Sequence, residues 1–395
     1  MNPPIITDES QVLPYDLPAL CLPETSKENW SQRRKQLLAL FSDHVYGRTP
    51  ALLPDISPRV KLIESAEVSL PTLALRRQFR ISFSDAYFNL LMYSPLEPAS
   101  GSALFLGLNF AGNHTISPDS AILLPTGWVS DIAETYPENH RATDAGRGTR
   151  SRRWPVAEIL RRGHTLATLH CSDLAPDQPE HPQINAFKSL FQTSPDPDAT
   201  WGNIGIWAWS LSRALDLIET LPEFKSSRVW ALGHSRLGKT ALWAAAQDPR
   251  FYGAVSNNSG CLGAAISRRC FGETIDLILG NFPHWFCPRL LQYAHREADM
   301  PLDQHMLLAL LAPRPLYVSS ASEDLWADPR GEFLSTLAAS DAWCLHGYRG
   351  LEPGTPPPAV GSPLHHERMG YHIRQGPHDI LASDWNHFMN FAESY

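Results

Sequence analysis

The stretch 228–247 constrains the fold of this chain more than any other. Residues 229–232 form an apolar run of strand length, and residues 240–247, rich in alanine, leucine and tryptophan, have the composition of a buried helix. The turn between them reads Gly-His-Ser-Arg-Leu-Gly-Lys and contains Ser235. A strand, a tight turn, a serine and a helix in this order predict a nucleophile elbow, in which the serine hydroxyl is exposed beyond the end of a strand.

The glycines of this turn fit the same interpretation. Gly233 leaves room for the turn, and Gly238 allows the new helix to pack closely against a sheet. The spacing, however, is G-x-S-x-x-G and not the usual G-x-S-x-G. An ordinary strand-to-helix connection capped by Ser235 is therefore the alternative, and the choice depends on the rest of the chain.

Strands and helices alternate over most of the sequence. A capping box at 25–28 predicts a helix that ends near Gly47, and residues 80–93 predict an antiparallel hairpin. After the hairpin, helical segments separate apolar runs of strand length, which lie at 103–108, 166–170, 229–232, 253–256, 315–320 and 371–374. This order predicts an α/β fold with a mostly parallel sheet, antiparallel N-terminal strands and helices on both faces, a three-layer sandwich.

We expect a single domain over residues 1–395, with an N-terminal extension over about 1–70. The chain has 395 residues, of which 43% are hydrophobic, and this is enough for a large core. The segments 115–153 and 173–201 have little periodicity, and loops of this length in a compact domain are usually lids or substrate walls.

Composition excludes several other classes of protein. The formal net charge is -8 and no basic block occurs, which argues against a nucleic-acid partner. No apolar run approaches the roughly 18 residues that span a bilayer. The N-terminus lacks a signal peptide, so the location stays open between the cytoplasm and a secreted or periplasmic form whose signal was removed. Six scattered cysteines predict mainly buried thiols, with one or two disulfides as the alternative, and we expect a monomer.

Three of the expected strand ends carry the residue types of a serine hydrolase. The carboxyl ends of parallel strands meet at one edge of a sheet, and here they carry Ser235, an acidic cluster around Asp324, and His378. Serine, acid and histidine follow in the chain order of the α/β-hydrolases. A neutral imidazole must take the proton of the serine hydroxyl, and a carboxylate must orient the imidazole and stabilise its cation. The sequence therefore predicts an α/β-hydrolase with this triad and with no metal or cofactor.

Other residues could fill the same roles. Glu323 is the alternative acid, whereas Asp328 is better placed to cap the helix that follows it. His387 falls in a predicted terminal helix and is interpreted as structural. Three further histidines are close in sequence but lack the spacing typical of zinc ligands, so the triad is preferred to a metal site at His365, His366 and His372.

The segment 233–239 also resembles the elbow of the glucuronoyl esterases, carbohydrate esterase family 15, which reads G-C-S-R-x-G-K. The likeness covers most of the chain from about residue 100 and points to the bacterial branch. Further segments share it in the same order along the chain: 108–114, 207–216, 271–274, 283–286, 324–329 and the end around His378. The resemblance implies an α/β-hydrolase that cleaves the ester between a lignin alcohol and the 4-O-methyl-glucuronate of xylan.

The resemblance also implies roles for residues near the elbow. Arg236 would donate to the oxyanion by its backbone and side chain, and Lys239 would bind sugar hydroxyls. Trp326 would contact the uronate ring, and Glu273 would provide a further polar contact. The alternatives are a salt bridge for Arg236, a solvated helix surface for Lys239 and a core position for Trp326. Trp285 is expected in the wall of the site or in the core.

Two positions depart from the family pattern. Fungal members carry a catalytic glutamate in an E-S-G segment, where this chain has Asn258-Ser259-Gly260. Asparagine carries no charge, so the resemblance places the acid on the loop of Asp324, as in bacterial relatives. His234 stands where many members have cysteine, so a disulfide between the elbow and the histidine loop is absent. We expect His234 to pack or to hydrogen-bond.

The predicted function is a serine carboxylic-ester hydrolase of glucuronoyl-esterase type, acting on a glucuronate-bearing polysaccharide or a small glucuronate ester. One alternative is an esterase for acetylated xylan or small aryl esters on the same scaffold, for which Lys239 would not be needed. The other alternative is a catalytically silent carbohydrate-binding protein.

Overall fold

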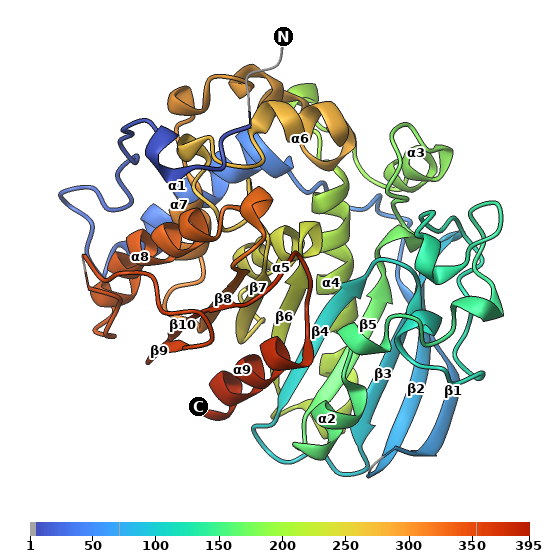
Figure 1. Cartoon of the computed structure of the whole chain (residues 1–395). Helices are drawn as coiled ribbons and strands as arrows, with labels where there is room; N and C mark the ends of the chain where they lie inside the picture. Colours follow the sequence, from blue (N-terminus) through green and yellow to red (C-terminus); the bar gives the residue numbers. More distant parts are fainter. Residues whose placement is uncertain (1–4, 71, 353) are drawn as a thin grey trace. The chain divides into compact units, whose positions relative to one another are not determined.

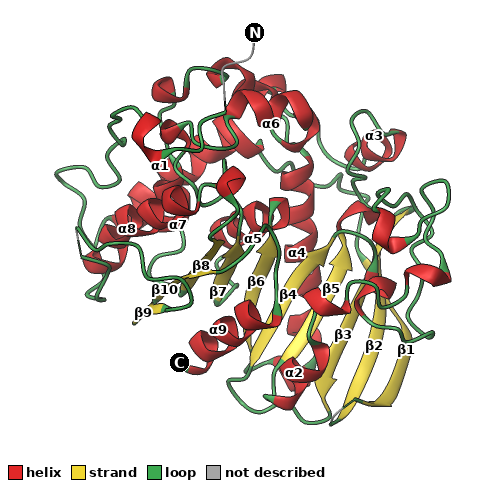
Figure 2. Cartoon of the chain, viewed as in Figure 1, coloured by secondary structure: helices red, strands yellow, loops and turns green. Residues whose placement is uncertain are grey.

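The computed structural model describes residues 5–70, 72–352 and 354–395. Its chain divides into two compact units. One unit comprises the N-terminal residues up to Arg48 together with 196–205 and 233–380, and the other comprises 49–195, 206–232 and 381–395. Figure 2 shows the strands and helices of both units.

The unit that contains residues 49–195 is built on six strands. Its sheet has the order β1-β2-β3-β5-β4-β6, in which β1, β2, β3 and β5 pair antiparallel and β4 pairs parallel with β5 and β6 (Figure 1). The strands are β1 (Arg59–Ser69), β2 (Leu73–Phe83), β3 (Ala86–Pro95), β4 (Ala103–Asn109), β5 (Thr165–His170) and β6 (Arg228–His234), whose last two residues belong to the other unit. The predicted hairpin is confirmed as β2 and β3.

Helices cover both faces of this sheet, as predicted. The strand registers place Phe105 of β4 and Phe83 of β2 on opposite faces. Trp385 of the last helix packs edge-on against Phe105 with the ring centroids 5.5 Å apart, and Trp209 of α4 packs against Phe83 at 4.8 Å. The helices are α2 (Val156–Arg161), α3 (Pro182–Lys188), α4 (Asn203–Thr220, in this unit from Ile206) and α9 (Ala382–Glu393).

The unit that contains residues 233–380 has the strand order β7-β8-β10-β9, with parallel pairing except between β10 and β9. Its strands are β7 (Gly253–Asn257), β8 (Leu316–Ala321), β9 (Leu364–His366) and β10 (Met369–Arg374). Its helices are α1 (Trp30–Phe41), α5 (Arg236–Gln247), α6 (Ile275–Asn281), α7 (Gln304–Ala309) and α8 (Pro329–Leu345). Because β7, β8 and β10 run in the same direction, the loops that follow them lie at one edge of the sheet.

The predicted α/β fold is therefore confirmed, with three local corrections. The capping box at 25–28 is wrong: α1 begins at Trp30, and the side chain of Thr25 instead accepts from Leu22 N at 2.9 Å within the preceding turn. Strands β1 and β9 and helices α3 and α6 were not predicted, and α3 lies in the segment 173–201 that was expected to be a loop. All six cysteines lie in the described ranges and are free, so the disulfide alternative is wrong. Within residues 5–70, 72–352 and 354–395, no helix is both long enough and apolar enough to cross a bilayer.

Candidate active site

Ser235 occupies the predicted elbow between β6 and α5. Its backbone has φ 58° and ψ −132°, a conformation that residues other than glycine rarely adopt. Its N–H donates to Asn257 O at 2.9 Å. The turn requires glycine before it, because a Cβ at Gly233 would lie 1.9 Å from Leu237 O. At Gly238 a Cβ would lie 3.0 Å from Ser259 Cβ, so this glycine allows the close packing that the sequence predicted.

His378 and Asp324 form a hydrogen-bonded pair on two of the loops that follow parallel strands. His378 lies after β10 and Asp324 after β8, and His378 Nδ1 is 2.5 Å from Asp324 Oδ2. The Asp324 side chain is 3% exposed, whereas that of His378 is 40% exposed. Burial raises the pKa of Asp324, but the hydrogen bond and positive charge of His378 outweigh it, so the net pKa lies below the ordinary value.

The two other acids considered from the sequence have different partners. Glu323 is exposed, and its Oε1 accepts from Gln375 Nε2 at 2.7 Å. Asp328 caps α8 by accepting from Gly331 N at 2.8 Å and pairs with Arg269 at 2.8 Å. The prediction that Asp328 caps this helix is confirmed, and Asp324 is the carboxylate that contacts His378.

One pocket of about 390 Å³ brings the predicted site residues together. The residues lining it include Ser235, His378 and Asp324, and the four residues that the family resemblance suggested for oxyanion and sugar contacts, Arg236, Lys239, Glu273 and Trp326. Trp326 is 40% exposed, so a core position is wrong for it. Trp285 lies in the wall, stacked on Phe282 with the ring centroids 3.9 Å apart, and the Arg236 guanidinium lies 5.4 Å from its ring.

Lys239 and Glu273 form the charged part of this pocket. Lys239 is 3% exposed, so the solvated-surface alternative is wrong. Its Nζ donates to Ser259 O at 2.5 Å and Cys261 O at 2.6 Å, and it lies 3.6 Å from Glu273 Oε2. Burial raises the pKa of Glu273, although Lys239 acts in the opposite direction. An ammonium and a carboxyl group therefore stand side by side in a largely buried wall.

Comparison with known proteins decides the family. The family model described as "Glucuronyl esterase, fungi" matches residues 155–347. A carbohydrate esterase, MZ0003, from an unknown prokaryotic organism is 40% identical over 98% of this chain and 91% of its own. The chain belongs to carbohydrate esterase family 15. Like the other members of this glucuronoyl esterase family, it is a carboxylic ester hydrolase with an α/β-hydrolase fold, which excludes the catalytically silent alternative.

Two solved structures of family 15 are similar over nearly the whole chain. A promiscuous esterase from a marine bacterial metagenome has a TM-score of 0.91 at 39% identity, with 99% of both chains covered. The glucuronoyl esterase from Solibacter usitatus has a TM-score of 0.88 at 38% identity, with 98% of this chain and 99% of its own covered. The family context supports hydrolysis of glucuronate esters.

In this family 15 esterase, Asn258, which the family resemblance matched to the fungal glutamate, contacts Asp324. Asn258 Nδ2 donates to Asp324 Oδ2 at 2.8 Å, the same oxygen that faces His378. Asn258 has a φ of 46°, so this contact depends on a tight turn directly after β7.

Glu332 holds that turn and was missed from the sequence. It is fully buried, and its Oε1 accepts from Ser259 N at 2.7 Å and Gly260 N at 3.0 Å, while its Oε2 accepts from Ser320 Oγ at 2.5 Å. Burial raises the pKa of Glu332 to about 8. The only signal in the sequence is an acidic residue in the first turn of a helix, which is common at helix starts and does not reveal a distant partner.

Three other histidines considered from the sequence contact neighbouring side chains. His234 Nδ1 is 2.6 Å from Asn257 Oδ1, and its ring lies 4.5 Å from that of His378, so it both hydrogen-bonds and packs. His372 and His365 contact the Tyr317 hydroxyl at 3.1 and 3.4 Å. In the part of the chain that the structure describes, no three His, Cys, Asp or Glu residues are grouped so as to hold a metal ion.

Proposed function

We propose that this protein hydrolyses esters of glucuronate and 4-O-methyl-glucuronate, with Ser235, His378 and Asp324 as the catalytic triad. The observation that carries the proposal is the arrangement of one pocket. The strained elbow presents Ser235 to the pocket in which His378 contacts a buried carboxylate, and the cations of Arg236 and Lys239 line the same pocket.

The proposed chemistry is an acyl transfer in two steps. His378 takes the proton of Ser235 as its oxygen attacks the ester carbonyl, and it then gives the proton to the leaving alcohol. Water, activated by the same imidazole, releases the uronate from the acyl-enzyme. Asp324 keeps the histidine ring oriented and stabilises the imidazolium that forms in each step.

Arg236 is proposed to stabilise the oxyanion. It is the first residue of α5, and the backbone N–H of the first helical residue has no acceptor within the helix. Arg236 also lines the pocket of Ser235, so the positive end of the helix dipole and the guanidinium could both stabilise the negative charge that develops on the carbonyl oxygen. One such donor contributes roughly 3 kcal/mol to lowering the barrier.

Lys239, Glu273 and Trp326 are proposed to bind the uronate ring. A sugar ring needs hydrogen-bond donors and acceptors for its hydroxyls and an apolar surface for its C–H groups, and these three side chains provide an ammonium, a carboxyl and an indole. The glucuronoyl esterase name of the Solibacter relative supports this substrate class. In a plant cell wall, the ester would join xylan-bound glucuronate to a lignin alcohol.

Replacement of the nucleophile tests the proposal. We expect Ser235→Ala to abolish turnover of benzyl and methyl glucuronate while the melting temperature stays near that of the wild type. A phosphonate ester should label the wild-type protein at Ser235 and should not label the variant. Glucuronate ester hydrolysis that persists in purified Ser235→Ala protein would reject the triad.

A broader ester specificity is the second candidate, because a family 15 relative of 39% identity is described as a promiscuous esterase. The two candidates differ in whether they need Lys239. We expect Lys239→Met to lower kcat/KM for methyl glucuronate at least tenfold more than for an aryl acetate. The ratio within one variant does not depend on the folded fraction. An equal loss on both substrates would favour the broad esterase.

A further inference from the structure

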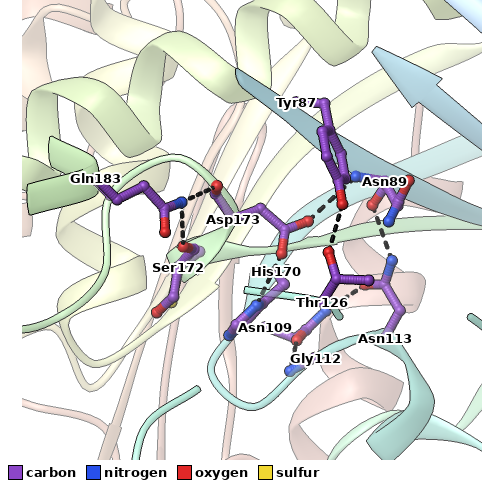
Figure 3. A network of polar contacts seen from close by, with 12 residues as sticks. Tyr87, Asn89, Asn109, Gly112, Asn113, Thr126, His170, Ser172, Asp173 and Gln183 are labelled. Carbon is purple, nitrogen blue, oxygen red and sulfur yellow. Dashed lines mark hydrogen bonds and ion pairs between the residues drawn. The ribbon is translucent and has the colours of Figure 1, made fainter. Parts of the chain in front are cut away.

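A second cavity lies within residues 49–195, and none of its lining residues lines the pocket of Ser235. Its volume is about 460 Å³, within the range typical of small-molecule sites. It lies where β3 begins, between the segment of Thr126 and helix α3. Because β3 is antiparallel to β5, the start of β3 and the residues that follow β5 belong to the same edge of the sheet. Figure 3 shows the polar network at this edge.

Asp173 lies at the centre of this network. Its side chain is 8% exposed, with Oδ1 3.0 Å from His170 Nδ1 and Oδ2 accepting from Asn89 N at 3.2 Å. Behind it, Asn113 Nδ2 donates to Asn89 O at 2.9 Å, and Asn109 Nδ2 donates to Asn113 Oδ1 at 2.7 Å (Figure 3). The carboxylate is thus held in place by neighbours that are themselves fixed, as a preorganised binding site requires.

Gln183 of α3 adds an oriented amide to the same cavity. Its Nε2 donates to Ser172 O at 3.4 Å and to Asp173 O at 2.5 Å (Figure 3). These contacts use the two amide hydrogens and leave the carbonyl oxygen Oε1 as an acceptor. Tyr87 is fixed as well, by a hydrogen bond between its hydroxyl and Thr126 Oγ1 and by the Arg80 guanidinium 4.0 Å from its ring.

The charge of the lining decides which ligand class fits. Among the described residues that line the cavity there are two carboxylates, Asp85 and Asp173, and no lysine, arginine or histidine. Arg80 and His170 contact the lining residues Tyr87 and Asp173 but do not line the cavity themselves. An anionic group such as a free uronate or a phosphate would therefore be less favoured here than in the pocket of Arg236 and Lys239. The rest of the lining combines hydroxyls and amides with the apolar side chains of Leu174, Phe187 and others.

We propose that this cavity is a second, non-catalytic binding site for a neutral glycosyl unit. An uncharged pyranose presents hydroxyls at its rim, which match the acceptors of Asp173 and Gln183, and C–H groups on its faces, which match the partly exposed side chains of Tyr87 and Leu190. The site would bind the uncharged backbone of a polysaccharide and would disfavour a free, ionised uronate. The choice of a sugar over other neutral ligands rests in part on the proposed function.

Direct binding without any ester tests this proposal, so that its outcome is independent of catalysis. The wild-type protein would be titrated calorimetrically with xylotetraose, which carries neither a charge nor an ester. We expect measurable binding of this neutral sugar. No binding of xylotetraose up to its solubility limit would overturn the proposal.

Two tryptophan substitutions on α3 locate the binding site. Ala186 is exposed and lines the cavity, so Ala186→Trp fills it, whereas the adjacent Asn185 is exposed and does not line it. We expect Ala186→Trp to weaken xylotetraose binding about tenfold or more, which is about 1.4 kcal/mol, and Asn185→Trp to leave it unchanged. Ser189 follows the last residue of α3 and also lines the cavity, so Ser189→Trp replaces Ala186→Trp if that variant does not fold. Equal affinity in the filled and control variants would place the sugar elsewhere and refute the proposal.

Discussion

Replacing Asp324 by asparagine removes the negative charge beside His378 with little change in shape. Asp324 Oδ2 accepts from both His378 Nδ1 and Asn258 Nδ2, at 2.5 and 2.8 Å. The single carbonyl oxygen of the asparagine can occupy this position and accept from both donors. The variant should therefore fold and keep the ring oriented, and what it loses is the stabilisation of the imidazolium that forms during catalysis.

The size of that loss follows from Coulomb's law. A carboxylate about 4 Å from the centre of the imidazolium charge contributes about 4 kcal/mol at an effective dielectric constant of 20. That energy corresponds to a factor of about 10³ in kcat. Exposure of the His378 ring lowers the figure, because water screens part of the interaction. If the asparagine amide turned its NH₂ toward His378, the wrong tautomer would be favoured, and the loss would approach about 10⁴.

The assay is steady-state hydrolysis of benzyl glucuronate by Asp324→Asn, with Glu323→Gln as the matched control. Glu323 precedes Asp324 in the chain but is exposed and contacts Gln375, so its replacement should change kcat less than about twofold. A loss below about tenfold in Asp324→Asn, or a larger loss in Glu323→Gln than in Asp324→Asn, would refute the assignment of the acid.

Two further predictions concern stability. Gly233→Ala should destabilise the protein by more than about 3 kcal/mol or prevent folding, because the new Cβ would lie 1.9 Å from Leu237 O. The control is Gly280→Ala in α6, whose Cβ would meet no atom within 4 Å. This control should be neutral or stabilising in a thermal melt. The second prediction concerns Glu332, whose pKa is about 8 in the folded protein against 4.5 ordinarily. Between these two pH values the folded protein holds a proton that the unfolded chain releases. The free energy of unfolding should therefore fall by about 1.4 kcal/mol per pH unit as the pH rises from 4.5 to about 8. Glu332→Gln should abolish this slope, and a constant difference in melting temperature between the variant and the wild type from pH 5 to 8 would contradict the reasoning.

The regular elements were predictable wherever a segment carried its own signal. Strands that are buried on both faces, such as β4 and β8, appear in the sequence as continuous apolar runs, and their bounds lie close to the predicted ones. Strand β1 has alternating residues too, but Val60 and Leu62 are both 51% exposed. An edge strand with a solvated face buries little apolar surface, so its sequence contains no strong pattern.

Lys239 illustrates what a single segment does not reveal. A lysine in the first turns of a helix is normally solvated, and the local sequence gives no reason to expect otherwise. It is buried because the carbonyls of Ser259 and Cys261 and the carboxyl of Glu273 surround its ammonium. These partners lie 20 or more residues away in the chain, and only the folded chain brings them together.

The sequence by itself determined the elbow, because a glycine, a serine and a helix in fixed spacing act on backbone conformation within a few residues. It also determined which residue types stand at the strand ends, and the family that their motifs resemble. The tertiary structure alone decided which acid contacts His378, that Glu332 holds the turn of Asn258, and that a second cavity exists whose described lining residues include no basic side chain. These features depend on distances between side chains that are far apart in the chain, and local propensities do not fix such distances.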